Sequence, residues 1–476
     1  MLRATKILAI IVLLALPAAA DVIVLKSGRR ISATDVVEEG NRVSYETPAG
    51  RLSIRKDLVE RIERGVAATP FGMPAEAPVE FQLSRPVDLG EGYEEMMRAT
   101  VGAGSVNREL IAQLEQQAQG DGKEALRRVL MAYRAASDFL LARKEIDEAI
   151  RYAERAFRYA PEHVSFLEQV AHLRLLKGEY RQALDSLERA RRQAPDSADV
   201  AKLTGWAYYG QNRIQQAVEE WRRAYALRPD PDVKKALEKA ERDKETESNY
   251  REGETQHFAL RYHGEAAPEL ARDLLRTLEE HFRELEATLR YTPREPIGVI
   301  LYTQEAFVDV TRAPAWAGAI NDGRIRIPVQ GLTLVTPQLA RVLKHELAHS
   351  FITLKTRGNA PVWLHEGIAQ WFEGSRSGRS AATLVSAYEK EAHLPLANLE
   401  GSFMSKSNTL AEYVYAWSLA VVEYIAETQG SYEIERILDR LAAGSDTETA
   451  VRETLKMSYP RLEEETVSYL RKAYLR

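Results

Sequence analysis

The sequence predicts a multidomain protein that is mainly α-helical, with α+β parts near its start and in its C-terminal half. Three observations support this fold class. A β-rich stretch follows the first twenty residues, small residues recur at a 34-residue interval in the middle, and alternating strand and helix patterns give way to long helical segments toward the C-terminus. At 476 residues, 45% of them hydrophobic, the chain is long enough for about three domains with separate cores.

Composition narrows the function classes. The formal net charge of −5 argues against a nucleic-acid partner, which usually requires a basic surface. The chain contains no cysteine, which excludes disulfides and thiolate metal sites. After the first twenty residues no segment reaches about eighteen apolar residues, so stable membrane insertion is not expected once that segment is removed.

The first twenty residues have the pattern of a secretory signal. Arg3 and Lys6 precede an apolar run over 7–16, and three alanines over 18–20 form a small-residue cleavage site. The apolar run is short for a permanent anchor. We therefore expect residues 1–20 to be a signal peptide and the mature protein to be exported, either periplasmic or secreted; the lack of cysteine fits a chain that needs no disulfides there.

Residues 21–64 read as a small antiparallel β unit. Runs rich in valine, isoleucine, leucine and tyrosine are interrupted by the turn signals KSG, EEGN and PAG. Nothing in this unit indicates chemistry. Residues 65–89 contain Pro70, Pro74, Pro78 and Pro86, and are interpreted as a proline-rich linker.

The middle of the chain is repetitive. The interval of 34 residues separates successive members of three sets: Pro161, Pro195 and Pro229; Ala149, Ala183 and Ala217; and Ala156, Ala190 and Ala224. Small residues at helix contacts and a proline closing each unit resemble the tetratricopeptide repeat. We assign residues 90–249 to an α-helical solenoid, with the best repeats over 130–230. Its concave surface could bind a protein partner, or the array could serve only as a spacer.

The segment KHELAHSF carries the strongest chemical signal. On a helix, His345 and His349 lie one turn apart on one face and can present two imidazoles to one zinc ion. Glu346 lies beside the first ligand, where it can act as a general base toward a water at the metal. A catalytic zinc site needs a third protein ligand, and Glu366, on a second helix after a short turn, would complete a His₂Glu set.

HELAH followed by WLHEGIAQWF resembles the gluzincin metallopeptidases, especially their peptidase-MA-like group, and the resemblance extends from about Glu254 to the C-terminus. We therefore assign residues 250–476 to a gluzincin-like peptidase domain. The resemblance implies an α+β half followed by a helical half, with Glu366 as the third zinc ligand. His365 occupies the place where the aminopeptidase branch usually has asparagine, and could instead cap the helix, support a ligand or compete as one. The resemblance also implies a downstream tyrosine that stabilises the oxyanion. Tyr415 matches best, with Tyr413 and Tyr424 as competitors.

The sequence therefore predicts an exported zinc-dependent peptidase that acts on a peptide or protein substrate. The strand GRIRIPV, over 323–329, is a candidate sheet edge for substrate pairing, and its Arg324 and Arg326 are interpreted as solvated side chains more readily than as ligands of a substrate carboxylate. An aminopeptidase needs an acidic group near the zinc to bind the α-amine of its substrate. The sequence lacks a strand of the G-x-M-E-N type that would supply this group, which favours an endopeptidase. The alternative is a repeat-based scaffold that carries a catalytically silent peptidase-like domain.

Overall fold

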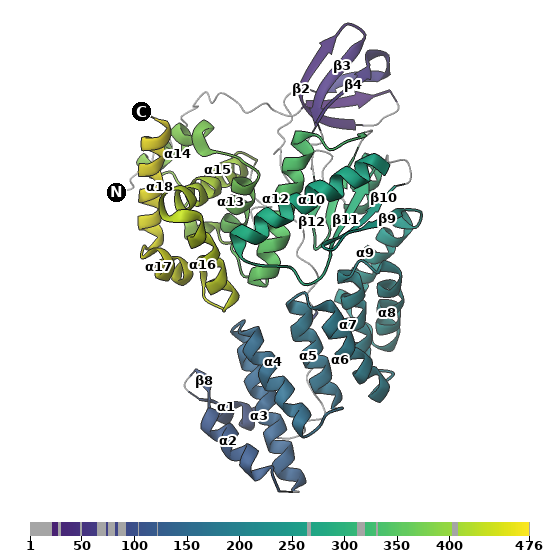
Figure 1. Cartoon of the computed structure of the whole chain (residues 1–476), viewed down its shortest axis with the longest axis vertical. Coiled ribbons are helices and arrows are strands. Elements are labelled where there is room, and N and C mark those ends of the chain that lie inside the picture. The colour runs from purple at the N-terminus through teal and green to yellow at the C-terminus, as the bar shows by residue number, and fades with distance from the viewer. Residues whose placement is uncertain are drawn as a thin grey trace, which may run out of the picture.

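The structure, a computed structural model, describes residues 21–26, 30–47, 50–63, 73–74, 81–83, 92–102, 104–120, 122–263, 268–311, 319–329, 332–401 and 408–475. The expected signal peptide over 1–20 lies outside these residues. A small sheet, an arc of paired helices and a larger C-terminal region follow one another along the chain (Figure 1). The prediction of a mainly α-helical, multidomain fold with α+β parts is confirmed. Among the helices of the described ranges, none combines the length and the apolar character needed to cross a bilayer.

The N-terminal strands form one antiparallel five-stranded sheet in the order β4-β3-β2-β1-β5. A small core of Ile23, Val36, Val43 and Tyr45 holds it together. Its strands are β1 (Asp21–Leu25), β2 (Arg30–Glu39), β3 (Arg42–Thr47), β4 (Gly50–Arg55) and β5 (Val59–Glu63).

The middle of the chain is an array of antiparallel helix pairs. The guanidinium of Arg189 donates to the carbonyl of Pro161, and that of Arg223 makes the same contact with Pro195 one repeat later. The alanines at the repeat interval are fully buried. They lie where two paired helices touch, and that contact leaves no room for larger side chains. The helices are α1 (Tyr93–Thr100), α2 (Arg108–Gln117), α3 (Lys123–Ala142), α4 (Ile146–Arg155), α5 (Val164–Leu176), α6 (Tyr180–Gln193), α7 (Ala198–Gly210), α8 (Ile214–Leu227) and α9 (Pro231–Glu247).

A six-stranded mixed sheet opens the C-terminal region, in the order β6-β12-β13-β11-β10-β9. Its central strand β11 is buried along its whole length, as its apolar, β-branched sequence predicts. The elements are β6 (Met73–Pro74), β9 (Arg251–Glu254), β10 (Phe258–Tyr262), α10 (Pro268–Leu289), β11 (Ile297–Tyr302), α11 (Gln304–Thr311), β12 (Ile320–Asn321) and β13 (Ile325–Pro328). One strand, β6, comes from the proline-rich segment near the start of the chain.

Helices make up the rest of the C-terminal region, and they share one large core with the sheet. Helix α12 packs on α10 and β12, α13 packs on α12, and α15 packs on α13. These contacts bring the HELAH helix between the sheet and the last helices (Figure 1). The helices are α12 (Pro337–Thr356), α13 (Val362–Phe372), α14 (Ala381–Glu389), α15 (Asn408–Tyr424), α16 (Ser431–Ala442), α17 (Thr447–Leu455) and α18 (Tyr459–Tyr474).

The expectation that β13 forms the sheet edge is wrong. Strand β13 lies between β11 and β12, so both of its sides are paired inside the sheet. The strand outside it is β12, and the outer side of β12 is paired in turn with β6. The sequence pattern cannot show this, because β12 and β6 are only two residues long and lack a strand signal.

The interpretation of Arg324 and Arg326 as solvated side chains is also wrong. Each arginine is only 1% exposed, because the last turns of α9 cover them. Arg324 forms ion pairs with Asp243 at 2.6 Å and with Glu247 at 3.1 Å. Arg326 pairs with Asp243 at 2.7 Å and with Asp322 at 3.0 Å. This buried ion cluster joins the repeat array to the C-terminal sheet.

We expect Asp243→Ala to destabilise that junction by about 3–5 kcal/mol, because two buried guanidinium groups lose a shared partner. Burial alone would raise the pKa of Asp243, but Arg324 and Arg326 outweigh it and lower that pKa. The contribution is therefore complete above the ordinary carboxyl pKa of about 4 and is lost as pH falls further. Urea denaturation followed by tryptophan fluorescence measures the change, with Glu238→Ala on the exposed face of α9 as the control. Equal midpoints for the two variants would contradict the assignment.

Candidate metal site

Helix α12 places the two histidines of the HELAH segment side by side. The helix begins after Thr336, whose hydroxyl accepts from the amide of Leu339 at 3.1 Å, and continues without interruption to Thr356. His345 and His349 are one turn apart, and their Nε2 atoms are 3.1 Å from each other. The side chain of His345 is 1% exposed and that of His349 is 14% exposed, so the first imidazole is buried and the second is partly accessible to solvent.

Helix α13 brings Glu366 to the same point. Its Oε2 atom is 3.8 Å from the Nε2 atoms of both His345 and His349. One ligand atom from each of the three residues lies within 4.8 Å of the others. The glycine that follows makes this possible, because a Cβ at Gly367 would lie 2.3 Å from the carbonyl oxygen of Ser418 on α15. Glu366 therefore supplies a candidate metal ligand, and Gly367 allows α13 to pack closely against α15.

Two buried carboxyl groups of the site have oxygen atoms without a donor among the described residues. Glu366 Oε2 and Glu346 Oε1 are buried, and neither has a hydrogen-bond partner in the described part of the chain. Burial raises the pKa of Glu346 to about 7 and that of Glu366 to about 8. Buried carboxylate oxygens without donors, facing two imidazole nitrogens, are the donor set of a divalent metal such as zinc. The residues present thus fit the metal that the sequence pattern implies.

Further polar residues orient the two histidines. His345 Nδ1 is 3.0 Å from Glu373 Oε2, and Ser375 donates to the other oxygen of that carboxylate at 2.5 Å. Burial lowers the pKa of His345, but Glu373 and the other nearby carboxylates outweigh it and raise the pKa to about 9. A carboxylate behind a metal-ligating histidine fixes the ring and increases its basicity. Sequence reasoning missed Glu373, although its spacing of seven residues from Glu366 on the same helical face was available.

His365 lies on the far side of His349. The two Nδ1 atoms are 3.2 Å apart, whereas the Nε2 atom of His349 faces His345 and Glu366. Burial lowers the pKa of His365 to about 4, so its ring is neutral at neutral pH and can exchange one hydrogen bond with His349. This geometry fits an orienting partner better than a competing ligand.

Asn321 is a second residue that sequence reasoning missed. From β12, its side-chain amide donates to the backbone carbonyl of Glu346 at 2.8 Å and to the hydroxyl of Ser350 at 2.7 Å. It therefore fixes the sheet against the middle of α12. The N-D-G turn was the only sequence signal at this position, and it does not indicate a contact with a helix.

The three candidate tyrosines lie in different surroundings. Burial raises the pKa of Tyr415, and the negative charges of Glu366 and Glu346 raise it further. Burial raises the pKa of Tyr413, with a further rise from Glu463 and not from the metal-site carboxylates. The hydroxyl of Tyr424 accepts from Gln429 at 3.2 Å. Among the three, the described contacts associate only Tyr415 with the metal site.

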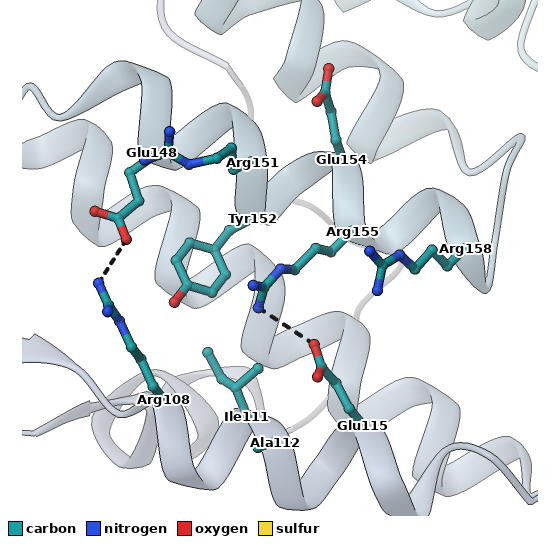
Figure 2. Close-up of a pocket in the computed structure, with 10 residues that line it drawn as sticks. All are labelled: Arg108, Ile111, Ala112, Glu115, Glu148, Arg151, Tyr152, Glu154, Arg155 and Arg158. Atoms are coloured by element: carbon teal, nitrogen blue, oxygen red, sulfur yellow. Dashed lines mark hydrogen bonds and ion pairs between the residues drawn. The ribbon is translucent and has the colours of Figure 1, made fainter.

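A separate groove of about 620 Å³ lies between α2 and α4 of the helical array (Figure 2). Arg108 pairs with Glu148 at 3.1 Å and Arg155 pairs with Glu115 at 3.5 Å across it. The groove also contains exposed arginines without an ion-pair partner among the described residues, and its lining comprises Arg108, Ile111, Ala112, Glu115, Glu148, Arg151, Tyr152, Glu154, Arg155 and Arg158. It contains none of the metal-site residues.

Comparison with known proteins adds family information. Residues 280–471 match the family model described as Peptidase MA superfamily, and residues 140–206 match the model described as Tetratricopeptide repeat. A search of the curated proteins finds no match.

Solved structures similar to the chain include MamA proteins. The structure titled "MamA 41-end from Desulfovibrio magneticus RS-1" is 18% identical, with a TM-score of 0.24 over 33% of this chain and 88% of that one. The structure titled "MamA MSR-1 C2" is 19% identical, with a TM-score of 0.24 over 33% and 87%. According to the family matches, the chain carries a Peptidase MA superfamily domain, preceded by a tetratricopeptide repeat region.

Proposed function

We propose that this chain is a zinc-dependent peptidase of the gluzincin type that hydrolyses amide bonds of peptides or proteins. The observation that carries the proposal is the convergence of His345, His349 and Glu366, with the unpartnered Oε2 of Glu366 at 3.8 Å from both imidazoles. These three residues would hold the zinc. When bound, zinc supplies a Lewis acid that polarises the scissile carbonyl and makes water acidic enough to attack at neutral pH.

The chain's own residues supply the proton transfers. Glu346 Oε1 is buried and has no hydrogen-bond partner within the described ranges, so it is free to accept a proton from the attacking water. The same carboxyl group then delivers that proton to the amine that leaves. Its pKa, raised by burial to about 7, is close to the value at which a group both accepts and returns protons efficiently at neutral pH.

Tyr415 is proposed to donate a hydrogen bond to the oxyanion of the tetrahedral intermediate. Its hydroxyl remains protonated at neutral pH, because burial and the nearby carboxylates raise its pKa. We expect Tyr415→Phe to lower kcat by about 10²–10³-fold with a smaller change in KM, since the hydrogen bond matters chiefly in the transition state. Steady-state hydrolysis of an unstructured protein measures this, with Tyr413→Phe as the matched control. Equal losses for the two variants would contradict the assignment.

The helical array is proposed to bind a protein partner or the substrate. Its groove between α2 and α4 exposes Arg151 and Arg158, which have no ion-pair partner in the described residues, so it fits an acidic segment (Figure 2).

We further propose export, on the basis of the signal pattern over residues 1–20. The missing aminopeptidase strand favours cleavage within a polypeptide over removal of its first residue.

The test is to incubate the zinc-loaded protein with an unstructured protein and to follow new amino termini with and without a chelator. Hydrolysis that stops with the chelator and returns with zinc supports the peptidase. A protein that holds zinc but never releases new termini from a broad peptide library would favour the repeat-based scaffold.

A further inference from the structure

Residues 73–74 of the proline-rich segment cover one edge of the C-terminal sheet. Strand β6 pairs with β12 in parallel, with Met73 opposite Ile320 and Pro74 opposite Asn321. Without β6, the outer side of β12 would be an unpaired edge, which is a ready surface for an extended polypeptide. The chain therefore covers this edge with a segment from far away in its own sequence.

This edge adjoins the metal helix. Asn321 of β12 donates to the backbone carbonyl of Glu346 at 2.8 Å, so the strand is bonded directly to the turn of α12 that carries the proposed general base. A polypeptide paired with β12 would consequently lie beside the residues that carry the proposed chemistry. That place is held by Met73 and Pro74 in this structure.

The same segment is anchored a second time, in the helical array. Phe81 is only 1% exposed, and its ring lies 5.7 Å from Trp206 and 5.9 Å from Trp221, measured between ring centroids. Lys202 places its ammonium 6.0 Å from the centre of the Phe81 ring and donates to the carbonyl of Gln82 at 2.7 Å. An aromatic ring in an aromatic slot and a main-chain hydrogen bond beside it are the contacts by which a groove binds an extended peptide.

The two anchors are close enough for one short peptide. Seven residue steps separate Pro74 from Phe81, so the two positions are at most about 25 Å apart, because an extended chain spans no more than about 3.6 Å per residue. A polypeptide could therefore pair with β12 and fill the aromatic slot at the same time.

We propose that residues 73–74 and 81–83, here called the linker strap, are an intramolecular competitor for an extended polypeptide that binds at the same two anchors. The polypeptide pairs with β12 and inserts an aromatic side chain into the slot of Trp206 and Trp221, about seven residues toward its C-terminus. That the displaced polypeptide is a substrate rests on the proposed peptidase function; the competition itself does not.

The first test measures binding without catalysis. A fluorescent peptide with the sequence of residues 71–85 is titrated into the full chain and into Phe81→Ala, which removes the anchor of the resident strap. We expect the variant to bind the peptide about tenfold or more tightly than the wild type, since the site is no longer filled. The same peptide with alanine at the position of Phe81, and with Phe71 kept, should lose this binding. Equal binding to both proteins would overturn the proposal.

Two further measurements guard against a loss of fold. Phe139→Ala removes a half-buried aromatic side chain from the same array but from a different core cluster, and should bind the peptide as the wild type does. A second variant keeps Phe81 and introduces a site for an exogenous protease between residues 75 and 80. Cutting there unlinks the two anchors, so peptide binding and amide hydrogen exchange over 319–322 should both increase. If both remain at their uncut values, the strap is not a competitor.

Hydrolysis separates this proposal from the peptidase proposal. If peptide exchange follows the expected order but no variant hydrolyses any polypeptide, the strap stands and the peptidase proposal fails. If the wild type and Phe81→Ala hydrolyse an unstructured protein equally fast and bind the peptide equally, the peptidase stands and the strap proposal fails.

Discussion

Glu346→Gln is expected to lower the rate of peptide hydrolysis by about 10²–10⁴-fold while zinc content stays unchanged. Glutamine keeps the shape of the side chain but cannot accept a proton from water or return it to the leaving amine. Zinc retention is expected because the converging ligand atoms belong to His345, His349 and Glu366, and not to Glu346. The experiment combines initial rates on an unstructured protein with zinc per chain by elemental mass spectrometry.

The control is Glu423→Gln, a change at another buried carboxylate. Glu423 is 1% exposed and accepts from the amide of Ser377 at 2.8 Å, on α15 away from the described contacts of the site. It should keep its zinc and its activity, apart from a modest loss of stability. Hydrolysis by Glu346→Gln at the wild-type rate would remove Glu346 as the base, and the proposed mechanism with it.

Helix geometry explains which parts of the site could be predicted. A spacing of four residues places His345 and His349 on one face wherever the segment is helical, so their proximity follows from local structure. Glu366 is seventeen residues further on, and a short turn between two helices leaves few arrangements. Glu373 caps the C-terminal end of the helix that carries Glu366, two turns further on, and could have been found by extending that reasoning.

Contacts that depend on distant segments were not predictable in this way. Both Arg324 and Arg326 have partners on α9, about eighty residues earlier, where a helix assigned only to the solenoid supplies Asp243 and Glu247. An alternating strand pattern indicates two faces but not which neighbours cover them. The pairing of β6 with β12 is similar, because two residues carry no periodicity.

The 34-residue repeat, in contrast, could be predicted from the sequence. Every repeat faces the same local constraint, so alanines recur where helices touch, and the repeat could be recognised without any long-range contact. What the repeats bind is a different matter. The aromatic slot that holds Phe81 is formed by Trp206 and Trp221 on neighbouring helices, and neither residue recurs at the repeat interval.

Glu366→Ala should produce the largest loss of zinc. Protein spanning residues 21–476 is expected to hold close to one zinc per chain, because two imidazoles and one carboxylate converge within 4.8 Å. Removing that carboxylate should weaken zinc binding by more than the roughly 10–100-fold expected for Glu373→Gln, which removes only an orienting partner of His345. Competition with a chelator, followed by elemental mass spectrometry, ranks the variants.

His365→Gln decides between the two residues that could serve as third ligand. The Nδ1 of His365 contacts His349 on the side away from Glu366, so this variant should retain near-stoichiometric zinc, with a loss no greater than that of Glu373→Gln. If His365→Gln loses zinc while Glu366→Ala keeps it, the ligand set must be reassigned to three histidines. If neither the wild type nor any variant binds zinc after reconstitution, the buried carboxylates of α12 and α13 are structural, and the function of the chain must be sought in its helical array.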